Sequence, residues 1–193
     1  MPPSKGTILI SGASKGIGHA LAFEAAKHGY DLICVARSED RLKKMAREIQ
    51  TQYQVHVSTF TVDLSDPKAT HRFIKAIQAQ KKPIDFLVNN AGLGMLGPVS
   101  KSTATMNQSM IQLNIQALVT LTHALLPAMI QAKHGRIVQI ASIAAWTPGP
   151  FFAIYYATKA FVQAFSLALH HELRGTGVTV LTVYPGPTHT HFG

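Results

Sequence analysis

The chain has 193 residues, of which 47% are apolar and 14% are charged, and its 18 basic and 9 acidic residues give a net charge of +9. This balance excludes an intrinsically disordered chain, which needs low hydrophobicity and high charge. The single cysteine, Cys34, excludes an internal disulfide framework. The longest apolar runs are shorter than the ~20 residues of a membrane-spanning helix, and the N-terminus has no signal-peptide pattern. We therefore predict one soluble, cytoplasmic domain over residues 1–193.

Strand-like apolar runs alternate with helical periodicity along the whole chain. In chain order, we predict a strand at 7–11, a helix at 17–27, a strand at 31–36, a helix from Ser38 to about 52, a strand at 56–62, a helix from Asp66 to about 80, a strand at 84–89, a helical region at about 103–133, a strand at 136–140, a helix at about 151–174 and a strand at 178–184. Near-continuous apolar strands are typical of parallel sheets covered on both faces. Right-handed crossovers then predict an α/β fold with a doubly wound, Rossmann-type sheet.

A glycine-rich turn follows the first strand, with Gly12, Gly16 and Gly18 in the spacing G-x-x-x-G-x-G. Glycines between a strand and a helix let the backbone approach a pyrophosphate, and the N–H groups of the helix N-terminus then face its negative charge. A merely tight strand-to-helix turn remains the alternative for this motif taken alone.

The second strand ends without an acidic residue at its tip, in the sequence Val35-Ala36-Arg37-Ser38. An acid there accepts a hydrogen bond from the ribose of NAD(H), whereas Arg37, helped by Lys15, can bind the 2′-phosphate of NADP(H). Glu39 and Asp40 follow closely and could serve the ribose, but their position favours helix-start acids. The sequence therefore predicts NADP(H) over NAD(H).

Further motifs occur in a fixed order after the glycine turn. They are Asn89-Asn90-Ala91-Gly92, Ser142, Tyr155-Tyr156-Ala157-Thr158-Lys159 and Pro185-Gly186-Pro187-Thr188-His189-Thr190, with 13 positions from Ser142 to Tyr155. From about Thr7 to Thr190 the chain resembles the short-chain dehydrogenase/reductase family, and the Pro-Gly-Pro-Phe-Phe stretch before Tyr155 is similar to its NADP(H)-preferring bacterial reductases.

Tyr155 and Lys159 are four residues apart on a predicted helix, so the ammonium group can lie beside the phenol. A free phenol has a pKa of about 10, and a nearby cation lowers it toward a value useful for acid–base catalysis. Tyr155 would then donate a proton to a carbonyl oxygen to which Ser142 hydrogen-bonds. Tyr156 lacks a lysine at the same spacing, because residue 160 is alanine. The resemblance implies that Asn114 holds a water for a proton relay through Lys159.

The resemblance also implies a set of cofactor-binding residues, in which Asp63 meets the adenine and Thr190 the nicotinamide carboxamide. The set is Gly12, Ser14, Lys15, Gly16, Ile17, Gly18, Arg37, Asp63, Asn89, Ala91, Gly92, Tyr155, Lys159, Pro185, Gly186 and Thr190. We expect no metal site, because no carboxylate or cysteine pattern completes His189-x-His191.

Apolar residues beside the catalytic motifs suggest a hydrophobic carbonyl or alcohol substrate of small to medium size, although ordinary core or a dimer contact explains each of them equally well. They are Leu93, Met95, Leu96, Ala144, Trp146, Phe151 and Phe152. The sequence stops at Gly193, where family members continue into a substrate lid and a seventh strand, so we expect a chain that is C-terminally incomplete relative to the family. A homodimer through the helices at about 103–133 and 151–174 remains compatible with that expectation.

Three functions stay open at this point. The first is an oxidoreductase that interconverts a carbonyl and a secondary alcohol, and the second is a non-catalytic dinucleotide-binding module. The third is a nucleic-acid binder, which a pI near 9.9 would fit. The basic residues alternate with acidic ones at helical spacing, which favours a solvated surface. We therefore expect neither nucleic acid nor membrane as a partner.

Overall fold

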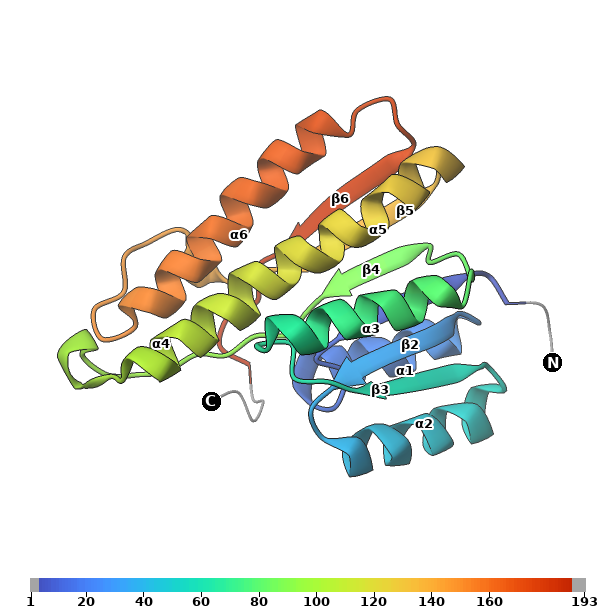
Figure 1. The fold of residues 1–193 in the computed structure, drawn as a ribbon, viewed down its shortest axis with the longest axis horizontal. Helices are drawn as coiled ribbons and strands as arrows, with labels where there is room; N and C mark the ends of the chain where they lie inside the picture. The colour runs from blue at the N-terminus through green and yellow to red at the C-terminus, as the bar shows by residue number, and fades with distance from the viewer. Residues whose placement is uncertain (1–3, 189–193) are drawn as a thin grey trace.

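A computed structural model of the chain, in which residues 4–188 are described, contains a single parallel β-sheet (Figure 1). Its six strands lie in the order β3-β2-β1-β4-β5-β6. They are β1 (Thr7–Ser11), β2 (Asp31–Ala36), β3 (Val57–Thr61), β4 (Phe86–Asn89), β5 (Gly135–Ile140) and β6 (Val178–Val183). The predicted α/β, doubly wound fold is confirmed, and each predicted strand is present to within two residues.

Helices cover both faces of the sheet. They are α1 (Gly16–Lys27), α2 (Glu39–Tyr53), α3 (Pro67–Ala79), α4 (Ala104–Ile111), α5 (Leu118–Ala132) and α6 (Ala153–Glu172), with short turns η1 (Val99–Lys101) and η3 (Ile143–Ala145). One core packs α1 and α2 on strand residues such as Ile10 and Cys34. The other packs α3, α5 and α6 on Leu9, Leu87 and Ile137. Burial raises the pKa of the Cys34 thiol to about 12, which suits a core residue.

The strand order reverses between β1 and β4, which are hydrogen-bonded neighbours. The chain passes from β1 to β2 and β3 on one side, then returns to place β4, β5 and β6 on the other. In open parallel sheets, ligands bind outside the carboxyl ends of the strands at such a switch point. The fold thus places the glycine turn after β1 and the Asn90-Ala91-Gly92 segment after β4 on either side of one crevice.

The predicted helical region at about 103–133 is divided into three parts. Between α4 and α5 lies one wide π-helical segment, η2 (Gln112–Ala117). The wider turn contains the buried Asn114, whose amide bonds to the loop after β4. π-Bulges occur frequently at functional sites, and hydrophobic periodicity alone does not reveal one. The whole stretch Ala104–Ala132 is long and apolar enough to cross a membrane by length and composition, but Leu121, Leu125 and Met129 pack in the sheet's core.

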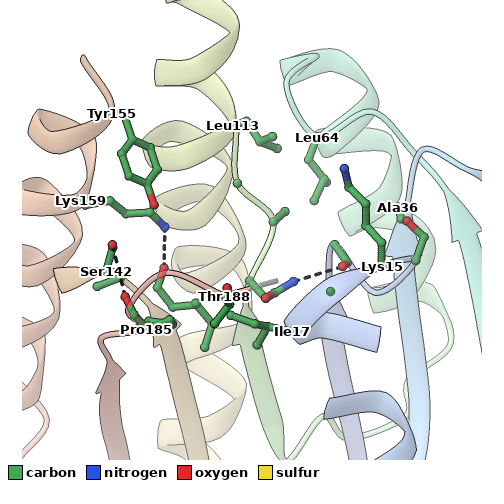
Figure 2. A pocket seen from close by; sticks show the side chains of 18 of the residues that line it. Lys15, Ile17, Ala36, Leu64, Leu113, Ser142, Tyr155, Lys159, Pro185 and Thr188 are labelled. Atoms are coloured by element: carbon green, nitrogen blue, oxygen red, sulfur yellow. Dashed lines mark hydrogen bonds between the residues drawn. The ribbon is translucent and has the colours of Figure 1, made fainter. Parts of the chain in front are cut away.

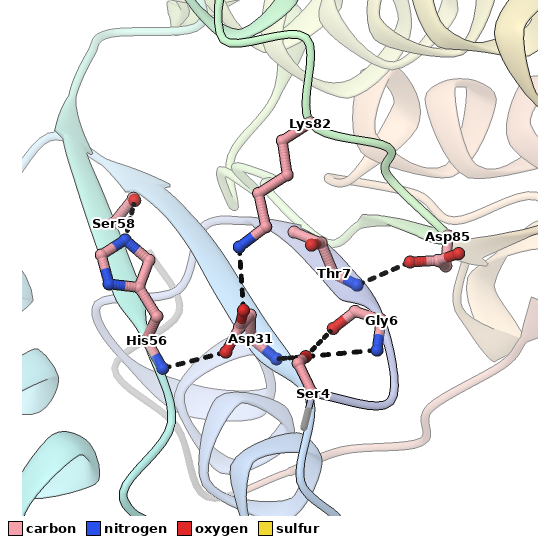
Figure 3. Close-up of polar contacts among 8 residues, drawn as sticks. All are labelled: Ser4, Gly6, Thr7, Asp31, His56, Ser58, Lys82 and Asp85. Carbon is pink, nitrogen blue, oxygen red and sulfur yellow. Dashed lines mark hydrogen bonds and ion pairs between the residues drawn. The ribbon is translucent and has the colours of Figure 1, made fainter. Parts of the chain in front are cut away.

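Carboxylates satisfy main-chain groups at the amino ends of the strands, on the side away from the crevice (Figure 3). Asp85 Oδ2 accepts the N–H of Thr7 at 2.6 Å. Asp31 Oδ1 accepts the N–H of His56 at 2.9 Å, and its Oδ2 pairs with Lys82 Nζ at 2.8 Å. These contacts join β1, β2 and the segments before β3 and β4 at the end of the sheet where the strands begin.

Candidate active site

A pocket of about 760 Å³ lies at the carboxyl ends of the strands. Most predicted site residues line it: Gly12, Ser14, Lys15, Gly16, Ile17, Arg37, Asp63, Ala91, Gly92, Ser142, Tyr155, Lys159, Pro185 and Gly186. Figure 2 shows Tyr155, Lys159 and Ser142 at one end of this pocket and Lys15, Ala36 and Leu64 at the other. The fold therefore brings the two groups of motifs into a single cavity.

The glycine turn needs its glycines for both conformation and space. Gly12 and Gly16 have φ of 69° and 58°, values that residues with a Cβ rarely adopt. A Cβ on Gly18 would meet the main-chain oxygen of Gly12 at 2.5 Å and would also strike the Asn90 amide. Gly18 thus packs the turn against the segment after β4 and does not line the pocket.

Ser11 joins the two sides of the crevice through its hydroxyl. The group accepts the N–H of Asn90 at 2.9 Å and of Ala91 at 3.0 Å, and donates to the oxygen of Val88 at 3.2 Å. Asn90 Nδ2 in turn donates to the oxygens of Ser11 and Gly12 at 2.9 and 3.1 Å. A buried serine hydroxyl therefore fixes the loop after β4 to the glycine turn.

Basic residues gather at the end of the pocket formed by β1 and β2. Lys15, Arg37 and Arg41 all line it, with Ser38 between the two arginines in sequence. Arg41 was missed from the sequence, because it is the third residue of α2 and only the fold brings it to the tip of β2. Glu39 and Asp40 occupy the first turn of α2, as their position predicted, and Glu39 pairs with Lys43. Asp63 is the one acid on the pocket wall among the described residues, and its Oδ1 accepts from both the N–H and the hydroxyl of Ser65.

The opposite end of the pocket carries Tyr155 and Ser142. Burial raises the pKa of Tyr155 above its ordinary value, the hydrogen bond with Ser142 lowers it in part, and the neighbouring Tyr156 raises it further. Ser142 Oγ also accepts the N–H of Ala144 at 3.2 Å and lies 3.5 Å from the oxygen of Pro185. A phenol and an alcohol hydroxyl thus meet at one point of the pocket wall.

Lys159 is buried, and its side chain reaches into the site beside Tyr155 (Figure 2). Its Nζ donates to the main-chain oxygen of Ile140 at 2.7 Å and lies 5.8 Å from the centroid of the Tyr155 ring. Burial lowers the pKa of Lys159 to about 8. The pKa of Tyr155 is raised rather than lowered as expected, and desolvation of the phenol is the largest cause.

Asn114 lies behind the pocket wall, where its amide bridges three segments. Nδ2 donates to the oxygen of Leu93 at 2.8 Å and to Thr158 Oγ1 at 3.0 Å, and Oδ1 accepts the N–H of Leu93 at 2.8 Å. A Cβ added to Gly92 would lie 3.5 Å from Asn114 Oδ1 and 3.7 Å from Lys159 Nζ, so both groups face the same glycine. Asn114 therefore joins η2, the loop after β4 and α6 beside Lys159.

Asn89, another predicted cofactor residue, does not line the pocket. Asn89 was expected to line the cleft, but it is buried and its Nδ2 donates to Thr122 Oγ1 of α5 at 3.0 Å. The alternation of side chains along β4 turns Asn89 toward the helices, and its neighbour Asn90 lines the pocket instead. Thr190 lies outside the described residues.

The seven apolar residues proposed for the substrate fall into three groups, of which Leu93 and Met95 are half-buried and do not line the pocket. Ala144 and Phe152 line the pocket, together with Ile143 and Leu113. Leu96, Trp146 and Phe151 are exposed instead and do not line it. Within residues 4–188, no cluster of three or more histidine, cysteine or acidic side chains has the arrangement of a metal site.

Comparisons with known proteins agree with this geometry. The family model for short chain dehydrogenases matches residues 6–193. Sulfoacetaldehyde reductase 2 of Chromohalobacter salexigens is 38% identical over 187 residues, which are 96% of this chain and 73% of that protein. Serine 3-dehydrogenase of Agrobacterium fabrum is also 38% identical, over 97% of this chain and 74% of its own.

Solved structures show the same similarity. A short-chain dehydrogenase from Sphingobium yanoikuyae in complex with NADPH superposes with a TM-score of 0.93 at 36% identity, covering 97% of this chain and 73% of that one. A bulky-bulky ketone specific alcohol dehydrogenase from Comamonas testosteroni superposes with a TM-score of 0.92 at 32% identity. The match covers 97% of this chain and 74% of that one. The ordered motifs, the switch-point pocket and these matches lead to one conclusion: the chain belongs to the short-chain dehydrogenase family.

Proposed function

We propose that the chain is an NADP(H)-dependent oxidoreductase that interconverts a carbonyl group and a secondary alcohol on a small to medium hydrophobic substrate. The observation that carries this proposal is the shared pocket. Tyr155, Ser142 and Lys159 meet at one end of it, and Lys15, Arg37 and Arg41 meet at the other. A cavity of about 760 Å³ with acid–base groups at one end and cations at the other suits a long anionic cofactor next to a reacting carbonyl.

The residues at the glycine turn fit a dinucleotide. Side chains at Gly12 or Gly18 would collide with neighbouring main chain or with the Asn90 side chain, so the glycines let the turn pack closely against the segment after β4, while Gly12 and Gly16 line the pocket with main chain. The N-termini of α1 and α2 have no side-chain capping bond, so the N–H groups of both first turns stay available to phosphate groups. Arg37 and Arg41 supply planar guanidinium groups suited to a 2′-phosphate. The Sphingobium relative was solved with NADPH, which supports the same choice.

The nicotinamide ring, when bound, would supply or accept the hydride. Tyr155 would donate its phenolic proton to the carbonyl oxygen during reduction and take it back during oxidation. The raised pKa of Tyr155 keeps the phenol protonated at neutral pH, as a proton donor requires. Ser142 would hydrogen-bond the same oxygen and hold it at the phenol.

Lys159 and Asn114 would help to replace the proton that Tyr155 loses. With a pKa of about 8, Lys159 can exchange protons near neutral pH. Both N–H groups of the Asn114 amide are bonded, which leaves a lone pair of Oδ1 to hold a water near Lys159 Nζ across Gly92. Asn114 would therefore position a proton relay, while Tyr155, Ser142 and Lys159 act at the reacting atoms or directly beside them.

We also propose a cytoplasmic homodimer. Apart from the buried Lys159, α6 contains no charged residue before Glu172, although the chain carries a net charge of +9. Phe161 and Leu167 are exposed on this helix, and Ile111 and Ile130 are exposed on α4 and α5. Large apolar faces of this kind mark contacts with a partner. Sedimentation equilibrium of the protein against a Leu167→Glu variant would test the dimer, which the added charge should dissociate.

The catalytic assignment is tested by replacing each of the two adjacent tyrosines. Tyr155→Phe removes the proton donor, and Tyr156→Phe is a matched control because Tyr156 also lines the pocket. NADPH consumption should be measured with a panel of hydrophobic ketones. We expect Tyr155→Phe to lower kcat at least about 100-fold while NADPH still binds, and Tyr156→Phe to stay near the unaltered protein. Turnover that survives in Tyr155→Phe would overturn the mechanism. NADPH binding without turnover in the unaltered protein would favour the non-catalytic module.

A further inference from the structure

The turn that precedes α6 contains an aromatic residue in a conformation that disfavours it. Phe151 has φ of +64°. Three other non-glycine residues in the described chain have positive φ, namely Gln54, Lys81 and Lys133, and each follows the last turn of a helix, where the left-handed conformation is common. Phe151 instead lies just before a helix, so helix termination does not account for its conformation.

The surrounding hydrogen bonds identify a tight turn. The N–H of Phe152 donates to the oxygen of Gly149 at 3.0 Å, which closes a four-residue turn with Pro150 second and Phe151 third. A proline at the second position and a positive φ at the third are typical of a type II turn, and the third position of such a turn favours glycine or asparagine. The Phe151 side chain is 62% exposed, so burial of its ring does not compensate for the strain.

The main chain of Phe151 makes the contact that the turn provides. Its oxygen accepts the N–H of Gly97 at 2.7 Å. Gly97 belongs to the loop that starts at Asn90-Ala91-Gly92 and is bonded through Leu93 to Asn114. The bond therefore joins the loop after β4 to the segment just before α6, and residues of both segments line the pocket.

The turn is also packed directly on Tyr156 and, through Phe152, lies beside the catalytic Tyr155. A Cβ on Gly149 would meet the Tyr156 ring at 2.5–2.6 Å, so the main chain lies flat against that ring. The next residue, Phe152, lines the pocket with its ring 5.7 Å from that of Tyr155 and 6.2 Å from that of Tyr156, centroid to centroid. A change in the turn would move Phe152 and the first turn of α6 together.

We propose that Phe151 is a positioning residue that acts through its main chain. Its left-handed conformation directs its oxygen to Gly97, and this clasp between Phe151 and Gly97 fixes the width of the substrate end of the pocket and the place of Phe152 beside Tyr155. The aromatic ring itself is dispensable. This inference rests on the proposed function, because the substrate end is defined by the reaction assigned to Tyr155.

Substitutions at Phe151 that differ only in backbone preference provide the test. Phe151→Gly and Phe151→Asn remove the ring and favour positive φ, whereas Phe151→Val removes the ring and strongly disfavours it. Two quantities are measured: amide hydrogen exchange at Gly97 by NMR, and kcat/KM for a hydrophobic ketone at saturating NADPH. We expect Phe151→Gly and Phe151→Asn to keep the exchange rate at Gly97 and kcat/KM close to those of the unaltered protein. We expect Val to speed exchange at Gly97 and to lower kcat/KM about tenfold or more, with the NADPH dissociation constant unchanged.

Two results would overturn the proposal. Equal losses in Phe151→Gly and Phe151→Val would show that the ring matters rather than the backbone. Unchanged exchange and kcat/KM in Phe151→Val would show that the clasp has no positioning role. Should Phe151→Val fail to fold by circular dichroism, Phe151→Thr replaces it, because its β-branched side chain also strongly disfavours positive φ. If the unaltered protein reduces no ketone, the proposed function fails, while exchange at Gly97 still decides whether the backbone preference of residue 151 holds the clasp.

Discussion

Lys159 Nζ donates to the main-chain oxygen of Ile140 at 2.7 Å, so the ammonium group of α6 is held at the carboxyl end of β5. The same end of β5 leads to Ser142, which bonds to Tyr155. The buried lysine thus connects the helix that carries the phenol with the strand that presents the serine. Its placement has a measurable effect on stability, because a buried ammonium group is poorly solvated.

Replacing Lys159 by methionine should stabilise the folded protein at pH 7. Burial lowers the pKa of Lys159 from 10.5 to about 8. At pH 7 the lysine is charged in both states, so the folded state bears the whole desolvation cost, of the order of 3 kcal/mol at about 1.4 kcal/mol per pKa unit. Between pH 8 and 10.5 the folded lysine loses its proton before the unfolded one, and stability rises with pH.

The check on Lys159→Met is urea unfolding at several pH values. The variant should be more stable at pH 7 by roughly 1–3 kcal/mol, and the difference should shrink as the pH approaches 10.5. Its turnover should be lost. A variant that is less stable at pH 7 would mean that the bond to Ile140 outweighs desolvation.

Arg37→Ala and Arg41→Ala should each weaken NADPH binding about 10- to 100-fold, because each removes a charge-assisted contact at the basic end of the pocket. NADH lacks the 2′-phosphate, so its affinity should change little. Lys44→Ala is the matched control, since it removes a charge from the same helix away from the pocket wall. Isothermal titration with both cofactors measures these constants. Equal weakening for NADPH and NADH would contradict the assignment of a phosphate site.

Gly18→Ala should destabilise the fold by about 1–3 kcal/mol, the usual range for overpacking. The added carbon would lie 2.5 Å from the main-chain oxygen of Gly12 and would strike the Asn90 side chain, so the glycine turn must move away from the segment after β4. Thermal unfolding measures the loss, with Ala20→Gly in the same helix as a comparison for helix propensity alone. An unchanged melting temperature would show that the two segments separate freely.

Asp31→Asn should reduce stability at pH 7 by up to about 1 kcal/mol, a value limited by the exposure of Lys82. Burial raises the pKa of Asp31, but the hydrogen bond and charge of Lys82 and the N–H of His56 lower it more, so the net pKa is below 3.8. Stability from this group is complete above pH 3.8 and is lost as the pH falls through the lowered folded-state value.

Acid unfolding of Asp31→Asn, beside Glu48→Gln at an exposed position in the middle of α2 as control, measures that contribution. The Asp31 variant should lack part of the acid-dependent loss, whereas the Glu48 variant should retain it. Identical acid transitions for the unaltered protein and Asp31→Asn would show that the pair with Lys82 does not contribute.

The sequence predicted the strands well because their buried runs are short, apolar and bounded by glycine, proline or polar residues. It also predicted that Tyr155, Lys159 and Ser142 lie together, since spacing on a helix and a position just after a strand are local properties, and all three line the pocket. It missed η2, because a π turn changes the helix by one residue without altering its composition. It missed Arg41 and misplaced Asn89, because the positions of these side chains depend on how α2 and β4 are oriented in the fold. It also missed the raised pKa of Tyr155, because burial is a property of the folded chain.

The pairing of Phe151 with Gly97 was also invisible in the sequence. Pro150 indicates a turn, but the next residue, Phe151, is aromatic and occupies the third position, where a type II turn favours glycine. Local preference therefore argues against the conformation that the structure adopts. Departures of this kind are found at functional sites.

The most direct test of this account is an equilibrium titration of the unaltered protein with NADPH and, separately, with NADH. If the turn after β1, Arg37 and Arg41 form one NADP(H) site, both cofactors should bind with one equivalent per chain, and NADPH should bind at least about tenfold more tightly. Absence of saturable binding of either cofactor to a sample shown to be folded would contradict the assignment of this pocket.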